Sequence, residues 1–171
     1  VEDIYLREYA HPTTSRAHFA ASDKRLNRLY AAGVETFRQN TLDIFMDCPS
    51  RERAGWLCDS FFTARSAFCL SGDTRVETNF IENFLLPESF AHLPEGMLPM
   101  CYPSDHYNGN FIPNWAMWFV VELEEYVERS GDRAMADALK PRLMALFKYF
   151  ERFKNSDGLL EKLEKWVFVE W

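Results

Sequence analysis

The chain has 171 residues, 47% of them apolar and 16% aromatic, with a formal net charge of −7. This size and apolar content predict one folded domain with a sizeable core and exclude a disordered segment. Acidic and basic residues are interleaved, so nothing predicts binding to nucleic acid, and no apolar run is long enough to cross a membrane. The four cysteines and four histidines form no zinc pattern, so neither a metal nor another cofactor is expected, and the cysteines are interpreted as free thiols.

The first predicted elements are an extended lead-in and a helix. Residues 1–20 contain a strand-like run at residues 4–6 and then a loop, and we interpret them as a linker from a preceding domain. Ser22 and Asp23 can cap a helix, and apolar residues then recur at helical spacing over residues 22–40. Residues 41–56 lose this periodicity and contain a proline and a glycine, which predicts a loop before a helix at about residues 58–70.

A Ser-Gly-Asp sequence occurs twice, at residues 71–73 and 130–132, each time between two helical patterns. Glycine can end a helix in the left-handed conformation, and the following aspartate can cap the next helix. The sequence therefore predicts two helical hairpins, in which residues 73–86 follow the first turn and about 113–129 and 132–154 flank the second. Helix capping alone explains these residues, so they need no further function.

No strand pattern alternates with the helices, so the predicted fold class is all-α, built from antiparallel helical hairpins with a short extended N-terminal segment. Such hairpins suit an α/α toroid or an α-solenoid. Residues 87–112 form a long link with four prolines, and its aromatic residues favour a functional role. Within it, residues 105–107 (Asp-His-Tyr) are interpreted as a polar loop, with contact to substrate as the alternative.

The chemistry is concentrated in residues 47–59, which hold carboxylates, guanidinium groups and an indole. Sugar sites need this mixture, because carboxylates and arginines bind hydroxyl groups and an indole face stacks on a sugar ring. Glycoside hydrolysis also needs a protonated carboxylic acid, and Glu52 is the best candidate. Neighbouring Asp47 and Asp59 favour the protonated form of Glu52, whereas Arg51 and Arg53 oppose it. A solvated loop with surface ion pairs is the alternative interpretation.

The spacing Asp-Cys-Pro-x-Arg-Glu-Arg-x-x-Trp-x-x-Asp over residues 47–59 resembles the signature of bacterial α-L-rhamnosidases, glycoside hydrolase family 78. The resemblance extends upstream to residues 19–27 and downstream to Pro-Asn-Trp-x-x-Trp at residues 113–118 and the later Ser-Gly-Asp. Three positions depart from the family pattern: Cys58 stands where glycine is common, and Asn114 and Glu170 stand where aspartate is common.

The resemblance implies part of an (α/α)6 toroid, with residues 21–171 as the N-terminal part of the catalytic domain and the C-terminal part beyond it. It implies inverting hydrolysis of terminal α-L-rhamnosyl residues, with Glu52 as the general acid. The residues implied to hold the sugar are Asp47, Arg51, Trp56, Asp59, Trp115, Glu170 and Trp171. Trp166, Phe168 and Trp171 either line the interior of the barrel or simply pack.

Several consequences of this resemblance are expectations about partners and activity. The expected partners are a rhamnose-containing glycoside or saccharide and the remainder of the catalytic domain, and a homo-oligomer is left open. The general base of the family lies beyond residue 171, so the 171-residue chain alone is expected to be inactive and to expose an apolar edge. The alternatives are another deoxy sugar or a uronic acid as substrate, or a carbohydrate-binding relative without catalysis. The compartment is open between bacterial cytoplasm and periplasm or secretion.

Overall fold

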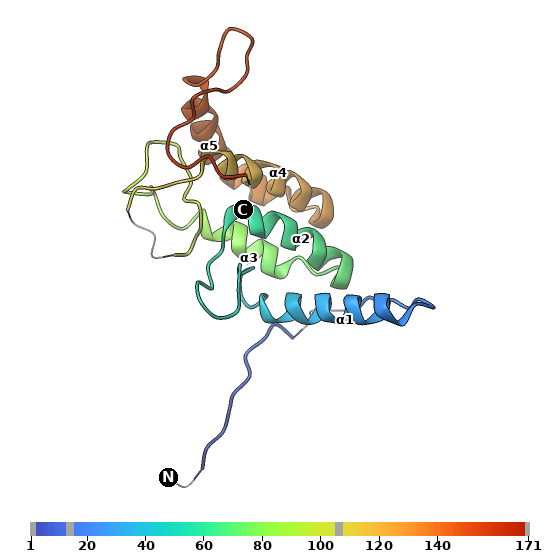
Figure 1. Cartoon of the computed structure of the whole chain (residues 1–171). Helices are drawn as coiled ribbons and strands as arrows, with labels where there is room; N and C mark the ends of the chain where they lie inside the picture. The colour runs from blue at the N-terminus through green and yellow to red at the C-terminus, as the bar shows by residue number, and fades with distance from the viewer. Residues whose placement is uncertain (1–2, 13–15, 105–107, 170–171) are drawn as a thin grey trace.

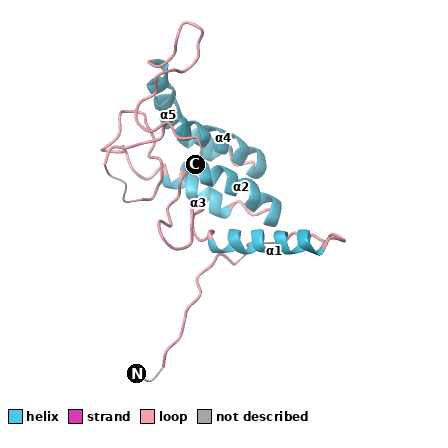
Figure 2. Cartoon of the chain, in the orientation of Figure 1, coloured by secondary structure: helices cyan, strands magenta, loops and turns pink. Residues whose placement is uncertain are grey.

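The computed structural model describes residues 3–12, 16–104 and 108–169. These residues form five helices and no strand (Figures 1 and 2), so the predicted all-α class is confirmed. The helices are α1 (Lys24–Gln39), α2 (Leu57–Ser71), α3 (Arg75–Asn83), α4 (Pro113–Ser130) and α5 (Arg133–Glu151). None of these helices is long and apolar enough to cross a membrane.

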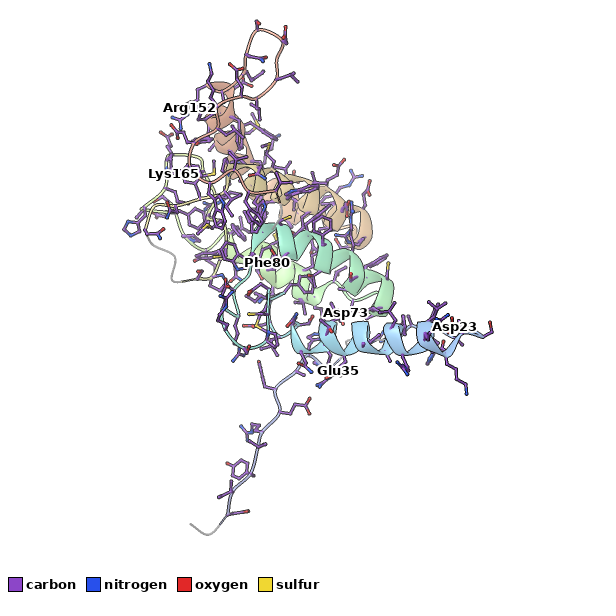
Figure 3. The ribbon with its side chains drawn as sticks, viewed as in Figure 1. Asp23, Glu35, Asp73, Phe80, Arg152 and Lys165 are labelled. Atoms are coloured by element: carbon purple, nitrogen blue, oxygen red, sulfur yellow. The ribbon has the colours of Figure 1, made fainter. Side chains whose placement is uncertain are left out.

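The two Ser-Gly-Asp turns connect the helices as predicted. Gly72 and Gly131 end α2 and α4 in the left-handed conformation, with φ of 68° and 75°. Asp132 caps α5 through a hydrogen bond from a backbone amide of its first turn, and Asp73 accepts one from the first residue of α3. Asp23 caps α1 in the same way, at the end of that helix labelled in Figure 3. The hairpins α2–α3 and α4–α5 therefore follow from local sequence.

The hairpins lie side by side, with α1 next to the first of them (Figure 1). The helix pair with the most extensive contact is α2 with α4, which come from different hairpins. Phe84, just after α3, connects the first hairpin to the second and to the long link. Its ring lies 4.6 Å from that of Phe119 on α4 and 5.6 Å from that of Tyr102 in the link. Phe80, labelled in the interior in Figure 3, packs on Phe84 at 5.4 Å. The main core thus lies among α2, α3, α4, α5 and the link.

The two long connections contribute more to the core than their sequence suggests. Buried apolar residues of the connections are Ile44, Phe45, Met46, Ala54, Met97, Leu98, Met100, Cys101, Phe111 and Ile112. They carry no helical periodicity, because the chain there has no regular secondary structure. None of the four cysteines, all within the described residues, forms a disulfide, as interpreted from the sequence.

The apolar face of α1 stays largely open within the described residues. Only Phe37 of this helix is buried, whereas Leu26 is 47% exposed and Leu29 is 70% exposed. A groove of about 560 Å³ runs between α1 and α2 beside this face. On α5, Phe147 is 46% exposed, because the described chain places nothing over that side of the helix.

The N-terminal segment leaves the helical body as an extended trace (Figure 1). The strand-like run at residues 4–6 pairs with no strand in the described chain, and its three side chains are exposed. The segment is attached further along, where the amides of Arg16 and Ala17 donate to the carbonyl of Leu70 at 2.7 and 2.8 Å. Backbone hydrogen bonds therefore connect it to the C-terminal end of α2.

Replacing Gly72 with Ala is expected to lower the free energy of unfolding by about 1 kcal/mol, because an L-residue is strained at this left-handed position. The added methyl group would meet no atom within 4 Å, so backbone strain is the whole effect. Gly33→Ala is the matched control, since it lies inside α1 with equally open space and should be neutral or stabilising. Thermal unfolding of both variants checks the prediction, and equal shifts would contradict it.

Candidate functional site

The loop that precedes α2 is closed by Asp47. Its carboxylate accepts a hydrogen bond from the amide of Ala54 at 3.0 Å, and its own amide donates to the carbonyl of Ala54 at 3.1 Å. These bonds bring the two ends of residues 47–54 together, so Glu52 lies on a short excursion of the chain. Arg53 within it has a positive φ of 53°, which is uncommon for a non-glycine residue.

The same loop is held from the other side by the long link. Leu57 donates to the carbonyl of Met100, and Tyr102 donates to the carbonyl of Gly55, both at 3.0 Å. Gly55 is required here because a Cβ atom would lie 2.8 Å from the carbonyl oxygen of Tyr102. The long link therefore fixes the chain immediately before α2.

Glu52, the predicted general acid, is held by two neighbours. The indole N–H of Trp56 donates to Oε2 of Glu52 at 3.1 Å, and the guanidinium of Arg51 pairs with Oε1. The carboxylate side chain is 28% exposed, whereas the Arg51 side chain is 83% exposed. Both oxygens of Glu52 thus have a donor, and Arg51 contacts Glu52 although the resemblance implied contact with the sugar.

Next to Glu52 begins a continuous row of aromatic side chains, which we call the aromatic wall. Trp56 lies edge-to-face on Trp115 of α4, with ring centroids 5.5 Å apart. Trp115 in turn lies edge-to-face on Phe168 at 5.4 Å. Asn114 holds this last residue, because its amide donates to the Phe168 carbonyl at 2.5 Å. The wall therefore joins the loop, α4 and the C-terminal segment.

A pocket of about 970 Å³ lies beside this wall. Its lining residues are Asn40, Met46, Asp47, Cys58, Asp59, Phe62, Thr63, Asn114, Trp115, Met117, Trp118, Val121, Phe168 and Val169. Of the predicted site residues, the structure brings Asp47, Asp59 and Trp115 into this pocket. Trp56 contacts Trp115 from outside the lining, and Glu52 and Arg51 follow beyond Trp56. Glu170 and Trp171 lie outside the described residues.

The pocket combines groups suited to a sugar. Asp47 and Asp59 supply carboxylates, Asn40 and Asn114 supply amides, and the aromatic wall supplies an apolar face. The Oδ1 atoms of both asparagines are buried without a hydrogen-bond partner among the described residues. Unpaired buried acceptors are costly unless a ligand or water satisfies them, and sugar hydroxyl groups are such donors. The pocket can therefore bind a ligand rich in hydroxyl groups.

Several residues that line the pocket were not predicted from the sequence as site residues. Phe62 and Thr63 follow Asp59 at helical spacing, so these three residues share one face of α2. Trp118 follows Trp115 at helical spacing on one face of α4. This spacing was the available signal. Phe168 had two open interpretations, and the structure places it in the pocket wall. Residues 105–107, interpreted as a polar loop, lie outside the described residues.

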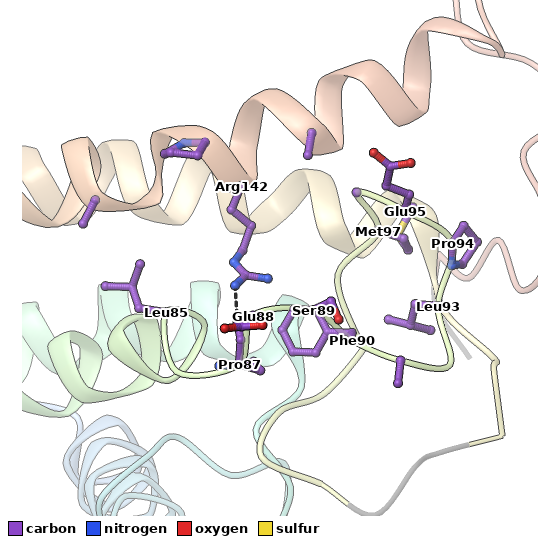
Figure 4. A pocket seen from close by; sticks show the side chains of 15 residues that line it. Leu85, Pro87, Glu88, Ser89, Phe90, Leu93, Pro94, Glu95, Met97 and Arg142 are labelled. Atoms are coloured by element: carbon purple, nitrogen blue, oxygen red, sulfur yellow. Dashed lines mark hydrogen bonds between the residues drawn. The ribbon is translucent and has the colours of Figure 1, made fainter.

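A second cleft, of about 650 Å³, lies between α5 and the start of the long link (Figure 4). Arg142 crosses it, donating to the carbonyl of Pro87 at 2.6 Å and lying over the ring of Phe90. Glu88 and Glu95 also line it, but none of the predicted sugar-site residues does. Arg142 therefore connects the link to α5, away from the carboxylates of residues 47–59.

The described chain thus combines two helical hairpins with an acidic and aromatic pocket beside the loop before α2. A family model, the bacterial alpha-L-rhamnosidase six-hairpin glycosidase domain, matches residues 14–171. The chain belongs to this family, and it is a domain of rhamnosidase-type glycoside hydrolases.

A solved structure supports the same assignment. The chain is similar to the crystal structure of a GH78 family rhamnosidase of Bacillus sp. GL1, with a TM-score of 0.77 and 25% sequence identity. The match covers 95% of this chain and 16% of that chain. No curated protein matches the chain. The recognised family and the hairpin architecture predicted from the sequence are confirmed.

Proposed function

We propose that the protein containing this domain hydrolyses terminal non-reducing α-L-rhamnosyl residues with inversion, and that Glu52 is its general acid. The observation that carries this proposal is the continuous arrangement of Glu52, Trp56 and Trp115 along the edge of a pocket lined by Asp47 and Asp59. Family membership supports the substrate class, and the pocket supports binding of a hydroxylated ring.

Each residue has a distinct role in this proposal. Asp47 and Asp59 accept hydrogen bonds from sugar hydroxyl groups, and Trp115 with Trp56 packs on the apolar edge of the ring. Glu52 gives its proton to the leaving oxygen.

Trp171 and Glu170 remain proposed contacts of the same sugar, at the end of the segment that Asn114 holds against α4. The asparagine suits this position because a carboxylate could not donate to the Phe168 carbonyl. Inversion also needs a second carboxylate about 6.5–9.5 Å from the acid, with a water between them. We propose that it comes from the part of the catalytic domain that follows residue 171, as in the family resemblance.

The full-length protein is expected to cleave an aryl α-L-rhamnoside and to release β-L-rhamnose first, as followed by proton NMR of the anomeric signal. Aryl α-L-fucoside, aryl α-D-mannoside and an aryl uronide are the comparison substrates. Faster cleavage of one of these comparison substrates would show that its sugar, and not rhamnose, is the substrate. Binding of L-rhamnose without cleavage of any member of the panel would favour a carbohydrate-binding relative.

A further inference from the structure

A buried carboxyl group connects α4 to the start of α2. Glu122 and Ser60 are both 0% exposed, and Oε2 of Glu122 lies 2.9 Å from Oγ of Ser60. The Ser60 hydroxyl also lies 2.8 Å from the carbonyl oxygen of Leu57. The other oxygen of Glu122 has no hydrogen-bond partner among the described residues.

The number of protons available for the hydrogen bonds among Glu122, Ser60 and Leu57 indicates whether Glu122 is neutral or ionised. Ser60 has one hydroxyl proton, and the Leu57 carbonyl can only accept. When Ser60 donates to Leu57, its contact with Glu122 needs a proton from the carboxyl group. A neutral Glu122 therefore satisfies both hydrogen bonds, and an ionised one satisfies only one of them.

The charged groups around Glu122 agree with this state. Glu77 on α3 and Glu125 on α4 are acidic, and the nearby cation, Arg129, pairs with these two at 2.5 and 2.8 Å. Glu122 forms no ion pair in the described structure. Burial raises its pKa well above the ordinary value, the Ser60 contact and Arg129 lower it, and Glu77 and Glu125 raise it further.

The anchored turn is the one that faces the sugar pocket. Leu57 and Ser60 belong to the first turn of α2. Trp56 directly precedes this turn, and Asp59 lies within it. Trp56, the N-cap of α2, makes no side-chain capping bond, so the turn lacks the usual local constraint. The Glu122–Ser60 contact attaches this turn to α4, in addition to the Leu57–Met100 hydrogen bond that attaches it to the long link.

We propose that Glu122, as a neutral acid, is a positioning residue that holds the first turn of α2 so that Trp56 and Asp59 face the substrate. This inference rests on the proposed function of the pocket. A shift of about 1 Å in a substrate-holding group can lower turnover by about 100-fold, so the position of this turn matters for catalysis.

The test compares Glu122→Gln, Glu122→Ala and Ser60→Ala in the full-length protein. Gln can donate its amide to Ser60 as the neutral acid does, so Glu122→Gln should keep kcat/KM within about threefold. Glu122→Ala and Ser60→Ala should lower kcat/KM by about 10- to 100-fold. Glu125→Gln is the matched control, since it disturbs the ion pairs of the same helix with Arg65 and Arg129 and should leave kcat/KM unchanged.

Stability against pH gives a second readout that needs no activity. A group whose pKa is raised on folding binds more protons in the folded state, so its contribution falls as pH rises above the ordinary glutamate value of about 4.5. The melting temperature of Glu122→Gln should therefore exceed that of the unchanged protein at pH 8, and the difference should shrink towards pH 4.5.

The outcomes separate this inference from the proposed function. A melting difference that does not vary with pH would overturn the neutral state of Glu122, whatever the activity. A loss of kcat/KM in Ser60→Ala no larger than in Glu125→Gln would overturn the positioning role. If the unchanged protein cleaves no glycoside, the proposed function fails and the positioning role fails with it, while the pH dependence still decides the state of Glu122. If Glu122→Ala does not fold, Ser60→Ala and Glu122→Gln carry the test.

Discussion

Replacing Glu52 with Gln should lower kcat for rhamnosides with poor leaving groups by about 10²- to 10⁴-fold, because the amide cannot give a proton to the leaving oxygen. The indole of Trp56 can still donate to the side-chain oxygen of Gln, so the loop should keep its position. Rates on natural rhamnosides and on a dinitrophenyl rhamnoside, measured with the full-length protein, check the prediction. The loss should be much smaller for the dinitrophenyl group, which departs without protonation.

A matched variant separates the loss of the acid from a general effect of removing a charge. Glu95→Gln makes the same chemical change in the cleft between α5 and the link, where no proposed sugar contact lies. Its activity should equal that of the unchanged protein. Equal losses on both rhamnosides in Glu52→Gln would mean that Glu52 binds the sugar or shapes the loop and is not the acid.

Replacing Phe84 with Ala should lower the free energy of unfolding by about 3–5 kcal/mol, the usual cost of removing a buried phenylalanine. Phe84 is 0% exposed, and it contacts rings of α3, α4 and the long link. The cavity would open between three elements that cannot all close on it. Because Tyr102 pairs with Gly55 next to the site, the change should also loosen the loop before α2.

Urea unfolding followed by tryptophan fluorescence measures this effect. Phe147→Ala is the matched control, because Phe147 is 46% exposed on α5 and its loss should cost only about 0.5 kcal/mol. The difference between two phenylalanine truncations then reports burial alone. Similar midpoints for both variants would show that Phe84 is not a central contact of the core.

Helix boundaries and hairpins could be predicted because their causes are local. The Ser-Gly-Asp turns contain the residue that tolerates the left-handed conformation and the residue that caps the next helix, and both act within a few positions of the chain. The loop at residues 47–59 was also visible in the sequence, because its carboxylates, arginines and indole stand close together. Its likeness to a known signature then indicated the family.

Glu122 illustrates what sequence patterns leave hidden. It is one of several glutamates in α4 and differs from Glu124, Glu125 and Glu128 only by its place on the helix. Spacing does put it in line with Trp115, Phe119 and Tyr126 on the buried side. Its partner Ser60 lies 62 positions earlier in the chain, so their contact depends on how α2 packs against α4.

The sequence by itself determined the all-α class, the two hairpins, the family and the cluster of chemical residues, because periodicity, caps and motif spacing are properties of neighbouring residues. Only the tertiary structure decided which of these residues share a pocket. It placed Asp47, Asp59 and Trp115 together and brought in Asn114 and Phe168, while Arg51 turned to Glu52. The reason is that the pocket is formed by packing between α2, α4 and two irregular connections, and side chains distant in sequence meet only when those elements pack.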